Sequence, residues 1–453
     1  MPEWWREYPE RDCEYVTYYP VAIEPMTADD VWATPRTSSA EAGLYVHVPL
    51  CRQLCPFCNY NKFVTGQHDV GALADGIARE IALYGEMLQP GSRRVPCVYF
   101  GGGTPSTLPL ADMERILTAA RRAFTIDDDT EISVEVHPTD ATLPYLQGLR
   151  ALGVSRVSFG IQSFNDRLLQ AIGSHHSGDD ARAALAAARA AGFDDVVSDL
   201  MFLLPTQTIE DWDADLATMA DLGAVHISLY RMLLDPSGPL ARKIRTRRVE
   251  RQGSQQLELE LAERGLDALA ERGFEHYGSC SSSGYDLCLP GYRSRYEEHH
   301  RAAPQGELIP IGPGAAGFAN GCVYWTIHTV PEYLAEVHAG RLPVLAGRRL
   351  TREDELSRYA VMGIKHLTLP KAPFAATYGV AFDDAFGATV ARLERHGLVV
   401  DSADAVRATR HGVLYLDNVC KAFYDADNYR VPQPYKIALQ LMSRDLFEAL
   451  PSA

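Results

Sequence analysis

The sequence lacks three features that would assign it to a special class of protein. No apolar run approaches the roughly 20 residues needed to cross a bilayer, so no membrane partner is expected. Positive charge is not in excess: 43 Lys and Arg stand against 59 Asp and Glu, a net charge of −16 that disfavours a nucleic-acid partner. The nine cysteines are an odd number in 453 residues, and no signal peptide precedes them. A disulfide scaffold is therefore disfavoured, and a cytoplasmic protein with reduced thiols is expected.

What the chain does have is three cysteines at a C-x3-C-x2-C spacing: Cys51, Cys55 and Cys58. Zinc motifs usually combine two C-x2-C pairs, or one pair with histidines. Three thiolates on one loop suit three irons of a [4Fe-4S] cluster, whose fourth iron stays open to a substrate or cofactor. The spacing therefore favours a cluster that takes part in chemistry over a zinc site or structural thiols.

Strand-like and helical segments alternate through the middle of the chain. The strand-like runs are residues 44–48, 97–100, 132–136, 157–161, 196–201 and 225–230, and the helical patterns are residues 71–88, 110–124, 143–152, 166–172, 179–191 and 209–222. Six strands separated by helices predict a parallel sheet with right-handed crossovers. Either an open doubly wound sheet or a full or partial barrel fits this order. Both place the site at the carboxyl ends of the strands.

Distinctive polar or glycine residues fall near those predicted strand ends. They are the run Gly101-Gly102-Gly103-Thr104-Pro105, then Glu135, Gln162, Asp199 and Tyr230. Taken singly, a glycine run is often only a turn, Glu135 a solvated carboxylate, and Gln162 a partner for strand-end backbone. Asp199 is harder to explain by structure alone, because a charge in a buried strand needs a partner. A ribose hydroxyl pair or a cationic amino group would satisfy it.

The ordered set of motifs resembles the radical S-adenosylmethionine (SAM) proteins. The motifs are the cysteine loop, GGGTP at 101–105, VEVHP at 134–138, SRVSFGIQSFN at 155–165, DLMFLLPTQT at 199–208 and HISLY at 226–230. More narrowly, they look like the branch that contains oxygen-independent coproporphyrinogen III dehydrogenase, over about residues 42 to 425. The resemblance implies an α/β fold with a partial (β/α)6 TIM-like barrel. It also implies a small C-terminal winged-helix-like α+β domain, and SAM chelating the open iron.

Site roles follow from the resemblance residue by residue. It implies that Cys51, Cys55 and Cys58 hold the cluster, and that Tyr45 and Tyr230 are catalytic. It further implies SAM binding by Gly101, Gly102, Gly103, Thr104, Glu135, Gln162 and Asp199, and a second SAM molecule near Ile311, Gly312 and Gly314. A flavodoxin or ferredoxin would supply electrons, and the substrate would be a small molecule.

Two positions depart from the dehydrogenase pattern. Tyr60 stands where that enzyme has an extra cysteine, and Ser174 stands where an arginine often contacts the SAM carboxylate. We therefore expect an enzyme that transfers a methylene or methyl unit from a second SAM to an sp2 carbon of a natural product, as in methyltransferases and cyclopropanases. The alternatives are a coproporphyrinogen dehydrogenase-like or haem-methylating enzyme, and a haem chaperone.

Three units are predicted: an N-terminal extension over residues 1–41, a barrel with its extension over 42–345, and a C-terminal winged-helix-like cap over 346–453. A capping-box-like start at Thr351, a helix over 383–396 and a small hairpin indicate a winged-helix-type unit. Its acidic residues make it a poor phosphate binder. Residues 278–288 are expected to form a loop rich in Ser, Gly and Cys, and residues 297–300 a solvated polar loop.

Overall fold

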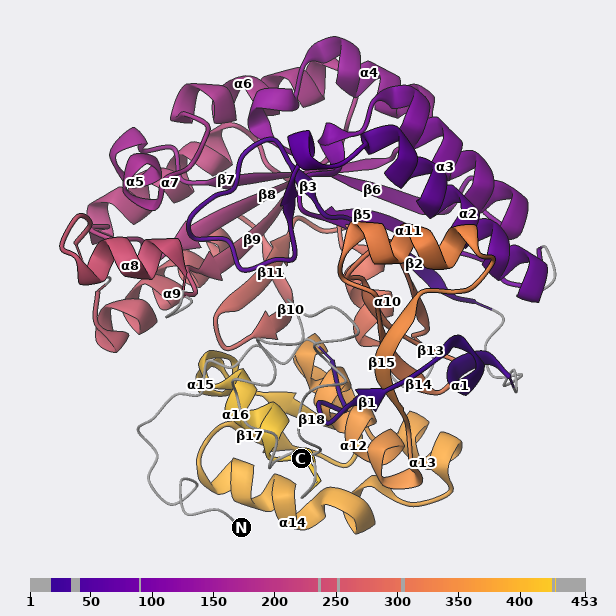
Figure 1. Cartoon of the computed structure of the whole chain (residues 1–453). Helices are drawn as coiled ribbons and strands as arrows, with labels where there is room; N and C mark the ends of the chain where they lie inside the picture. Colours follow the sequence, from indigo (N-terminus) through magenta and orange to yellow (C-terminus); the bar gives the residue numbers. More distant parts are fainter. Residues whose placement is uncertain are drawn as a thin grey trace.

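The computed structural model describes residues 18–33, 41–88, 91–234, 238–250, 253–302, 306–425 and 428. Six parallel strands form the centre of one large sheet, and each pairs with the next in chain order. They are β2 (Gly43–Val48), β5 (Cys97–Gly102), β6 (Glu131–Val136), β7 (Arg156–Gln162), β8 (Asp195–Phe202) and β9 (His226–Arg231). This order confirms the predicted parallel sheet, and the arrangement is a partial barrel (Figure 1).

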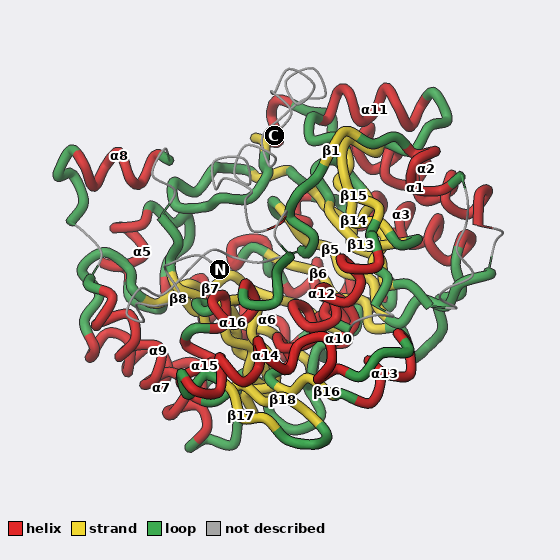
Figure 2. The backbone as a smooth tube through the Cα atoms, turned by 90° about the horizontal axis from the view of Figure 1, so that it is seen from below, coloured by secondary structure: helices red, strands yellow, loops and turns green. Residues whose placement is uncertain are grey.

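Helices between the strands cover the outer face of the sheet as an arc (Figure 1). They are α2 (Val70–Leu88), α3 (Leu110–Ala123), α4 (Leu143–Ala151), α5 (Asp166–Ile172), α6 (Gly178–Ala190), α7 (Ile209–Asp221) and α9 (Gln255–Ala270). Helix α8 (Pro239–Arg245) lies apart from this layer, at one edge of the barrel (Figure 2). Their apolar faces explain the packing: α3 buries Met113, Ile116, Leu117 and Ala120, which recur at helical spacing. One apolar stripe of each helix therefore packs on the outer face of the sheet. The strand ends that carry the polar residues are not covered by these helices and form the open edge of the barrel.

Further strands extend the sheet beyond both ends of the parallel core, and all of them except the one next to β2 pair antiparallel to their neighbours. Next to β2 come β12 (Leu308–Ile311), which is parallel to it, then β13 (Ala316–Ala319), β14 (Cys322–Thr326), β15 (Val344–Arg349) and β1 (Glu24–Pro25). Next to β9 come β11 (Gly284–Cys288) and β10 (Glu275–Ser281). The predicted loop over 278–288 is therefore wrong. All five residues of β11 are buried, including Tyr285 and Leu287, and the Ser and Gly residues before them conceal this strand in the sequence.

The predicted solvated loop at 297–300 is also wrong, because these residues belong to α10 (Arg295–Arg301). Ser294 caps the helix by accepting a hydrogen bond from the backbone N–H of Glu297. Arg301 is fully buried and pairs with Asp286 and Glu297, both at 2.6 Å. The charge of Arg301 is therefore neutralised by ion pairs inside the molecule. The pair with Asp286 forms only in the folded structure, so the sequence pattern did not reveal it.

The C-terminal part forms a smaller α+β unit, which lies below the barrel in Figure 1 and in front of it in Figure 2. Its helices are α12 (Arg352–Gly363), α13 (Ala372–Tyr378), α14 (Phe382–Arg395), α15 (Arg410–Leu414) and α16 (Leu416–Lys421), and its three strands are β16 (Thr368–Pro370), β17 (Val399–Asp401) and β18 (Ala405–Ala408). Thr351 and Asp354 form the predicted capping box. The expected α/β fold class with a small C-terminal unit is confirmed.

The remaining elements are α1 (Ala28–Trp32) in the N-terminal extension, α11 (Val330–His338), and the short strands β3 (Leu50–Cys51) and β4 (Phe63–Val64). The prediction for the N-terminal extension falls partly on residues 1–17 and 34–40, which lie outside the described residues. The three domain boundaries stay predictions. Among the described residues, no helix combines the length and apolar character that crossing a membrane requires.

Candidate functional site

The three cysteines lie on the loop that leaves β2 at the carboxyl edge of the sheet. Cys51 ends β3 and is buried, whereas Cys55 and Cys58 are partly exposed. The loop turns tightly between the last two, where the Cys58 N–H donates to the Cys55 carbonyl at 3.2 Å. The hydroxyl of Thr104 donates to Sγ of Cys51 at 3.3 Å, so the loop after β5 contacts the cysteine loop directly.

The chemistry of these thiols suits a bound cluster. Burial, together with the neighbouring Cys58 and Cys51, raises the pKa of Cys55 to about 12, although Lys62 opposes the rise. Three adjacent thiolates therefore need a positive centre to stabilise them, which cluster iron would provide. Within the described residues, no three His, Cys, Asp or Glu side chains converge as ligands of a single metal ion. A cluster places each thiolate on a separate iron, so its ligands lie further apart than those of one ion.

The glycine run at the end of β5 permits close contact with the cysteine loop. A side chain at Gly102 (φ +110°) would meet the His47 ring at 2.5 Å, and one at Gly103 would meet the Leu50 backbone at 2.8 Å. The Gly103 N–H also donates to the Val48 carbonyl at 2.9 Å. Only residues without a Cβ fit this junction, so these glycines pack the strand end tightly against the loop that carries the thiols.

Glu135 projects from β6 beside the glycine run. Its Oε1 accepts a hydrogen bond from the Tyr99 hydroxyl at 2.8 Å. Burial raises the pKa of Glu135 to about 7, although the hydrogen bonds from Tyr99 and the Gly102 backbone oppose that rise. A buried carboxyl that titrates near neutrality is suited to receive a cation such as a cofactor amino group.

Gln162 ends β7 in a left-handed conformation, with φ +64°. The ladder between β7 and β8 is irregular at this point, between Gly160 and Gln162. Non-glycine residues rarely adopt positive φ, and such strain concentrates at functional sites. The irregularity lies at the carboxyl end of β7, where a cofactor contact was predicted, and the amide of Gln162 lies over Gly160, since a Cβ there would be 2.7 Å from Nε2.

Asp199 on β8 has neither a hydrogen-bond nor an ion-pair partner among the residues that the structure describes. Burial raises its pKa well above the ordinary range, and the charges of Glu135, Asp286 and Glu297 raise it further. Asp199 remains partly accessible to solvent. A carboxyl enclosed in this way without a partner indicates a ligand that donates hydrogen bonds to it.

The two tyrosines predicted to be catalytic lie on opposite strands of the barrel. Tyr45 stacks with Tyr99, with 6.2 Å between the ring centroids. The hydroxyl oxygen of Tyr45 lies 2.9 Å from Nδ1 of His47. Nε2 of His47 faces the carbonyl of Asn61 at 3.2 Å and must carry the proton, so the Tyr45 hydroxyl donates to Nδ1. Tyr230 is partly buried and packs with the apolar cluster that includes Phe57 of the cysteine loop. Their catalytic roles stay predictions.

The glycine segment after β12 contacts helix α2 through a buried carboxyl. Ile311 is fully buried. The Gly312 N–H donates to Oε2 of Glu80 at 2.7 Å, and the Gly314 N–H donates to the Ile327 carbonyl at 2.9 Å. Both glycines have positive φ. These contacts are those of a tight structural turn, because the backbone donors already have partners within the protein.

The loop around Ser174 touches the cysteine loop. Ser174 contacts His176 at 3.0 Å, and Nε2 of His175 lies 3.5 Å from the carbonyl of Leu54. The sequence departure at Ser174 therefore lies close to the predicted cluster.

Two residues that sequence reasoning missed also help to build the site. Lys62 donates to the carbonyls of Cys58 at 2.6 Å and Tyr60 at 3.1 Å, and thus holds the end of the cysteine loop. Tyr99 fixes Glu135. The available signal for Lys62 was a polar residue four positions after the last cysteine. The signal for Tyr99 was its place between the buried residues Val98 and Phe100, which indicates that its side chain points to the inside of the barrel.

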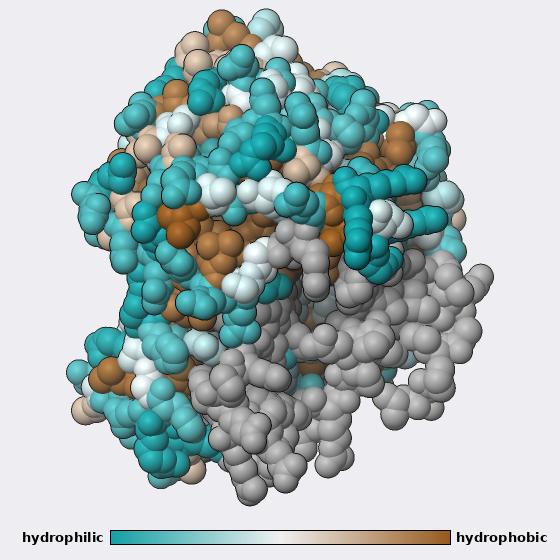
Figure 3. Space-filling view, turned by 90° about the vertical axis from the view of Figure 1, so that its left-hand side faces the viewer, coloured by the Kyte–Doolittle hydropathy of each residue, from teal (hydrophilic) through white to brown (hydrophobic). Residues whose placement is uncertain are grey.

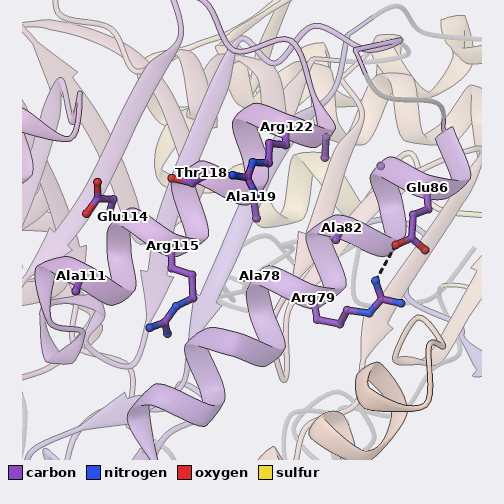
Figure 4. Close-up of a pocket in the computed structure, with 12 residues that line it drawn as sticks. Ala78, Arg79, Ala82, Glu86, Ala111, Glu114, Arg115, Thr118, Ala119 and Arg122 are labelled. Carbon is purple, nitrogen blue, oxygen red and sulfur yellow. Dashed lines mark hydrogen bonds and ion pairs between the residues drawn. The ribbon is translucent and has the colours of Figure 1, made fainter.

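A separate groove lies on the outer helical layer between α2 and α3 (Figure 4). Its lining is built from small and charged residues such as Ala82, Glu114 and Arg122, with Arg79 and Glu86 paired at 2.7 Å on one wall. No residue of the cysteine loop lines it. The groove is therefore not part of the candidate site.

Comparisons with known proteins agree with this geometry. A model of the radical SAM superfamily matches residues 45–219, and a model of the HemN C-terminal domain matches residues 350–415. The chain is 26% identical over 381 residues to the heme chaperone HemW of Bacillus subtilis, covering 84% of this chain and 98% of HemW. It is 28% identical over 424 residues to the oxygen-independent coproporphyrinogen III oxidase of Escherichia coli, covering 90% of this chain and 91% of the oxidase.

The solved structure of coproporphyrinogen III oxidase (HemN) from Escherichia coli has the same architecture. Its TM-score is 0.74 at 27% identity, over 85% of this chain and 91% of HemN. These relatives correct one prediction. The expected methyltransferase or cyclopropanase of natural-product metabolism is wrong, because the similar proteins are heme chaperones and coproporphyrinogen oxidases. Tyr60 and Ser174 therefore did not indicate methylene transfer.

Proposed function

Since this chain belongs to the radical SAM superfamily and has HemN-like relatives, we propose that it is a radical SAM enzyme that acts on a reduced tetrapyrrole in haem metabolism. The superfamily implies a [4Fe-4S] cluster and SAM, which together supply a hydrogen-abstracting radical when bound. The observation that carries the proposal is the meeting of three thiols with Glu135 and with Asp199, which has no partner among the described residues, at one edge of the barrel.

In this proposal each acidic residue holds a different part of SAM. Glu135 receives the amino group, since its carboxyl lies beside the Gly102 backbone and titrates near neutrality. Asp199 accepts hydrogen bonds from the ribose hydroxyls, which would supply the partner that it lacks within the described residues. Gln162 lies at the same edge, at the end of β7. Cys51, Cys55 and Cys58 hold the cluster, and Lys62 fixes the loop that carries them.

We propose one SAM molecule and not two. A second SAM at Gly312 and Gly314 would need backbone donors that already bond to Glu80 and Ile327. The HemN-like relatives are not methyltransferases by name, so nothing in them requires a second methyl donor.

The tetrapyrrole class rests on the relatives and on the lining of the barrel. The coproporphyrinogen oxidase aligns with 90% of this chain, including the C-terminal unit. Inside the barrel, Tyr45, Tyr99 and Tyr296 stack as a group of three nearly parallel rings. The ring centroids of Tyr99 and Tyr296 are 4.3 Å apart, and that of Tyr45 lies 6.2 and 6.1 Å from them. Flat aromatic faces of this kind pack well against pyrrole rings. We expect the substrate above this stack, next to Glu135 and Asp199.

A haem chaperone is the second candidate, and one residue favours it. Tyr60 replaces the cysteine found in the dehydrogenase, and its side chain is 61% exposed directly after the cysteine loop. HemW of Bacillus subtilis also aligns over 98% of its own length. In this reading the protein binds haem, and SAM cleavage is not coupled to a tetrapyrrole product.

The two candidates are separated by turnover. The protein is reconstituted with iron and sulfide and reduced, and then supplied with SAM and coproporphyrinogen III. The enzyme proposal expects 5′-deoxyadenosine together with carbon dioxide released from propionate side chains. Stoichiometric haem binding, with no substrate-dependent deoxyadenosine, would instead support the chaperone. Reconstituted protein that neither cleaves SAM nor binds haem would overturn both.

A further inference from the structure

A strongly basic surface stands out on this acidic chain. Within seven residues, 242–248, there are five cationic side chains and no acidic one: Arg242, Lys243, Arg245, Arg247 and Arg248. Together these five residues are called the basic surface. Four of them, all except Lys243, are exposed. Arg242, Arg247 and Arg248 form no ion pair with any residue that the structure describes. Their charge is therefore available to a partner.

The basic surface is attached to the cysteine loop. The N–H of Leu240, in the first turn of α8, donates to the carbonyl of Pro56 at 3.2 Å, between Cys55 and Cys58. Asn59 donates to the carbonyl of Leu233 at 3.3 Å. A Cβ at Gly173 would lie 2.9 Å from Cγ of Pro56 and 3.6 Å from Nζ of Lys243. Helix α8 thus lies beside the loop that carries the three thiols.

An apolar groove adjoins the basic side chains. Leu234, Ile244 and Val249 line it together with Arg245, Arg247 and Glu250. The same apolar residues are partly buried against one hydrophobic cluster, and Phe57 of the cysteine loop packs against that cluster as well. Helix α8 lies beside α5 at one edge of the barrel in both ribbon views, and the side facing the viewer in Figure 3 is mainly hydrophilic with small hydrophobic patches (Figures 1–3).

We propose that the basic surface docks a small, acidic electron-carrier protein that reduces the cluster. This inference rests on the proposed function, because a radical SAM cluster needs an electron. One electron leaves the reduced carrier, which becomes oxidised, and enters the oxidised cluster, which becomes reduced by one. No proton or leaving group is involved. Opposite charges would steer the encounter, and the apolar groove would receive the less polar centre of the carrier's face.

Placement and charge both favour this partner over a nucleic acid. Electron transfer requires that the two redox centres approach closely, and α8 contacts the loop that holds the thiols. Electron-transfer complexes are small and transient, so a single short helix with its following turn is enough surface. A nucleic acid spans many phosphates, and the net charge of −16 over the whole chain would repel it.

The test uses a bacterial flavodoxin as the probe and the full-length reconstituted protein. The variant Arg247→Glu/Arg248→Glu reverses two exposed charges of the basic surface. The variant Arg122→Glu/Arg395→Glu makes the same change in net charge at two exposed arginines elsewhere. Four quantities are measured: flavodoxin affinity and duplex-DNA affinity by calorimetry, the rate of cluster reduction by reduced flavodoxin, and deoxyadenosine formation driven by dithionite.

For Arg247→Glu/Arg248→Glu we expect flavodoxin affinity and the flavodoxin-driven reduction rate to fall about tenfold, with a weaker dependence on salt. Dithionite-driven deoxyadenosine formation should stay unchanged, because a small reductant needs no docking surface. The control variant should match the native protein. Equal flavodoxin rates in both double variants, or flavodoxin binding weaker than binding of duplex DNA, would overturn the docking proposal. Absence of dithionite-driven SAM cleavage in the native protein would overturn the proposed function instead, and a protein without a cluster would overturn both.

Discussion

The hydroxyl of Tyr99 on β5 donates a 2.8 Å hydrogen bond to Oε1 of Glu135 on the neighbouring strand β6. The contact fixes a buried carboxyl at the carboxyl edge of the barrel, beside the glycine run. One carboxyl oxygen is thereby committed to the protein. The Gly102 backbone also hydrogen-bonds to this carboxyl, and the ionisation of Glu135 decides how strongly it would bind a cationic group of a cofactor.

The first prediction concerns the pH dependence of SAM binding. Because the pKa of Glu135 is raised to about 7, its carboxyl is protonated below that pH and ionised above it. A cationic amino group binds the ionised form more tightly. We therefore expect SAM affinity, measured by calorimetry on cluster-loaded protein, to weaken up to about tenfold per pH unit as pH falls below about 7.

The matched variants for this measurement are Glu135→Gln and Tyr99→Phe. Glu135→Gln should bind SAM weakly at every pH, without the step near neutrality. Tyr99→Phe removes a hydrogen bond that lowers the pKa of Glu135, so its step should move to higher pH. A native protein whose SAM affinity is flat between pH 6 and 8 would show that Glu135 does not contact the cofactor.

The second prediction concerns the cluster. Replacing Cys55 by alanine should abolish the visible absorbance of the reconstituted cluster and all deoxyadenosine formation, because two thiolates cannot hold the site. The control is Cys288→Ala, which removes a buried thiol of β11 that lies outside the cysteine loop. It should retain both properties. Cluster absorbance and activity in Cys55→Ala equal to those of Cys288→Ala would remove the cluster assignment.

The third prediction concerns Asp199. Asp199→Asn should weaken SAM binding by about 1–3 kcal/mol, since an amide accepts hydrogen bonds from the ribose less well than a carboxylate. Cluster content should stay unchanged, because no iron ligand is lost. The measurement is SAM affinity together with iron and sulfide content. Unchanged affinity would assign Asp199 to a structural role.

Much of this fold was predictable because local signals agreed. The six central strands and the helices between them appear within a few residues of their predicted limits, since apolar periodicity and caps such as Ser177 and Thr208 mark them. The assignment of Cys51, Cys55 and Cys58 to a cluster came from their spacing and stays a prediction. Glu135 and Asp199 drew attention because each places a charge in a strand that packing alone would make apolar.

What the sequence could not supply depends on contacts between distant segments. The β10–β11 hairpin was concealed by Ser and Gly, and it is a pair of strands because β11 pairs along β9. The residues of α10 were misassigned because Arg301 is neutralised by Asp286, 15 residues away, and by Glu297. Glu80 gave no signal in the sequence, because its partners Gly312 and Tyr333 lie more than 200 residues further along the chain.

The last prediction concerns the effect of Glu80 on stability. Glu80 Oε2 accepts hydrogen bonds from the Gly312 N–H at 2.7 Å and the Tyr333 hydroxyl at 2.6 Å, and its Oε1 is buried without a partner among the described residues. Burial raises its pKa from 4.5 to about 8, which outweighs both hydrogen bonds. Between these two values the unfolded chain is ionised while the folded chain keeps its proton. The folded state therefore loses stability as pH rises from about 5 to 8, by at most about 1.4 kcal/mol per pH unit.

Glu80→Gln removes this titration and keeps an oxygen acceptor for Gly312 and Tyr333. We expect the free energy of unfolding of Glu80→Gln, measured by urea denaturation, to equal or fall slightly below that of the native protein at pH 5 and to exceed it at pH 8. The control Glu86→Gln, on the exposed side of the same helix, should show no such crossover, because its carboxyl pairs with Arg79 in solvent. A difference between Glu80→Gln and the native protein that stays constant from pH 5 to 8 would mean that Glu80 does not change its protonation on folding. The turn at Gly312 would then be held by a carboxylate that is charged in both states.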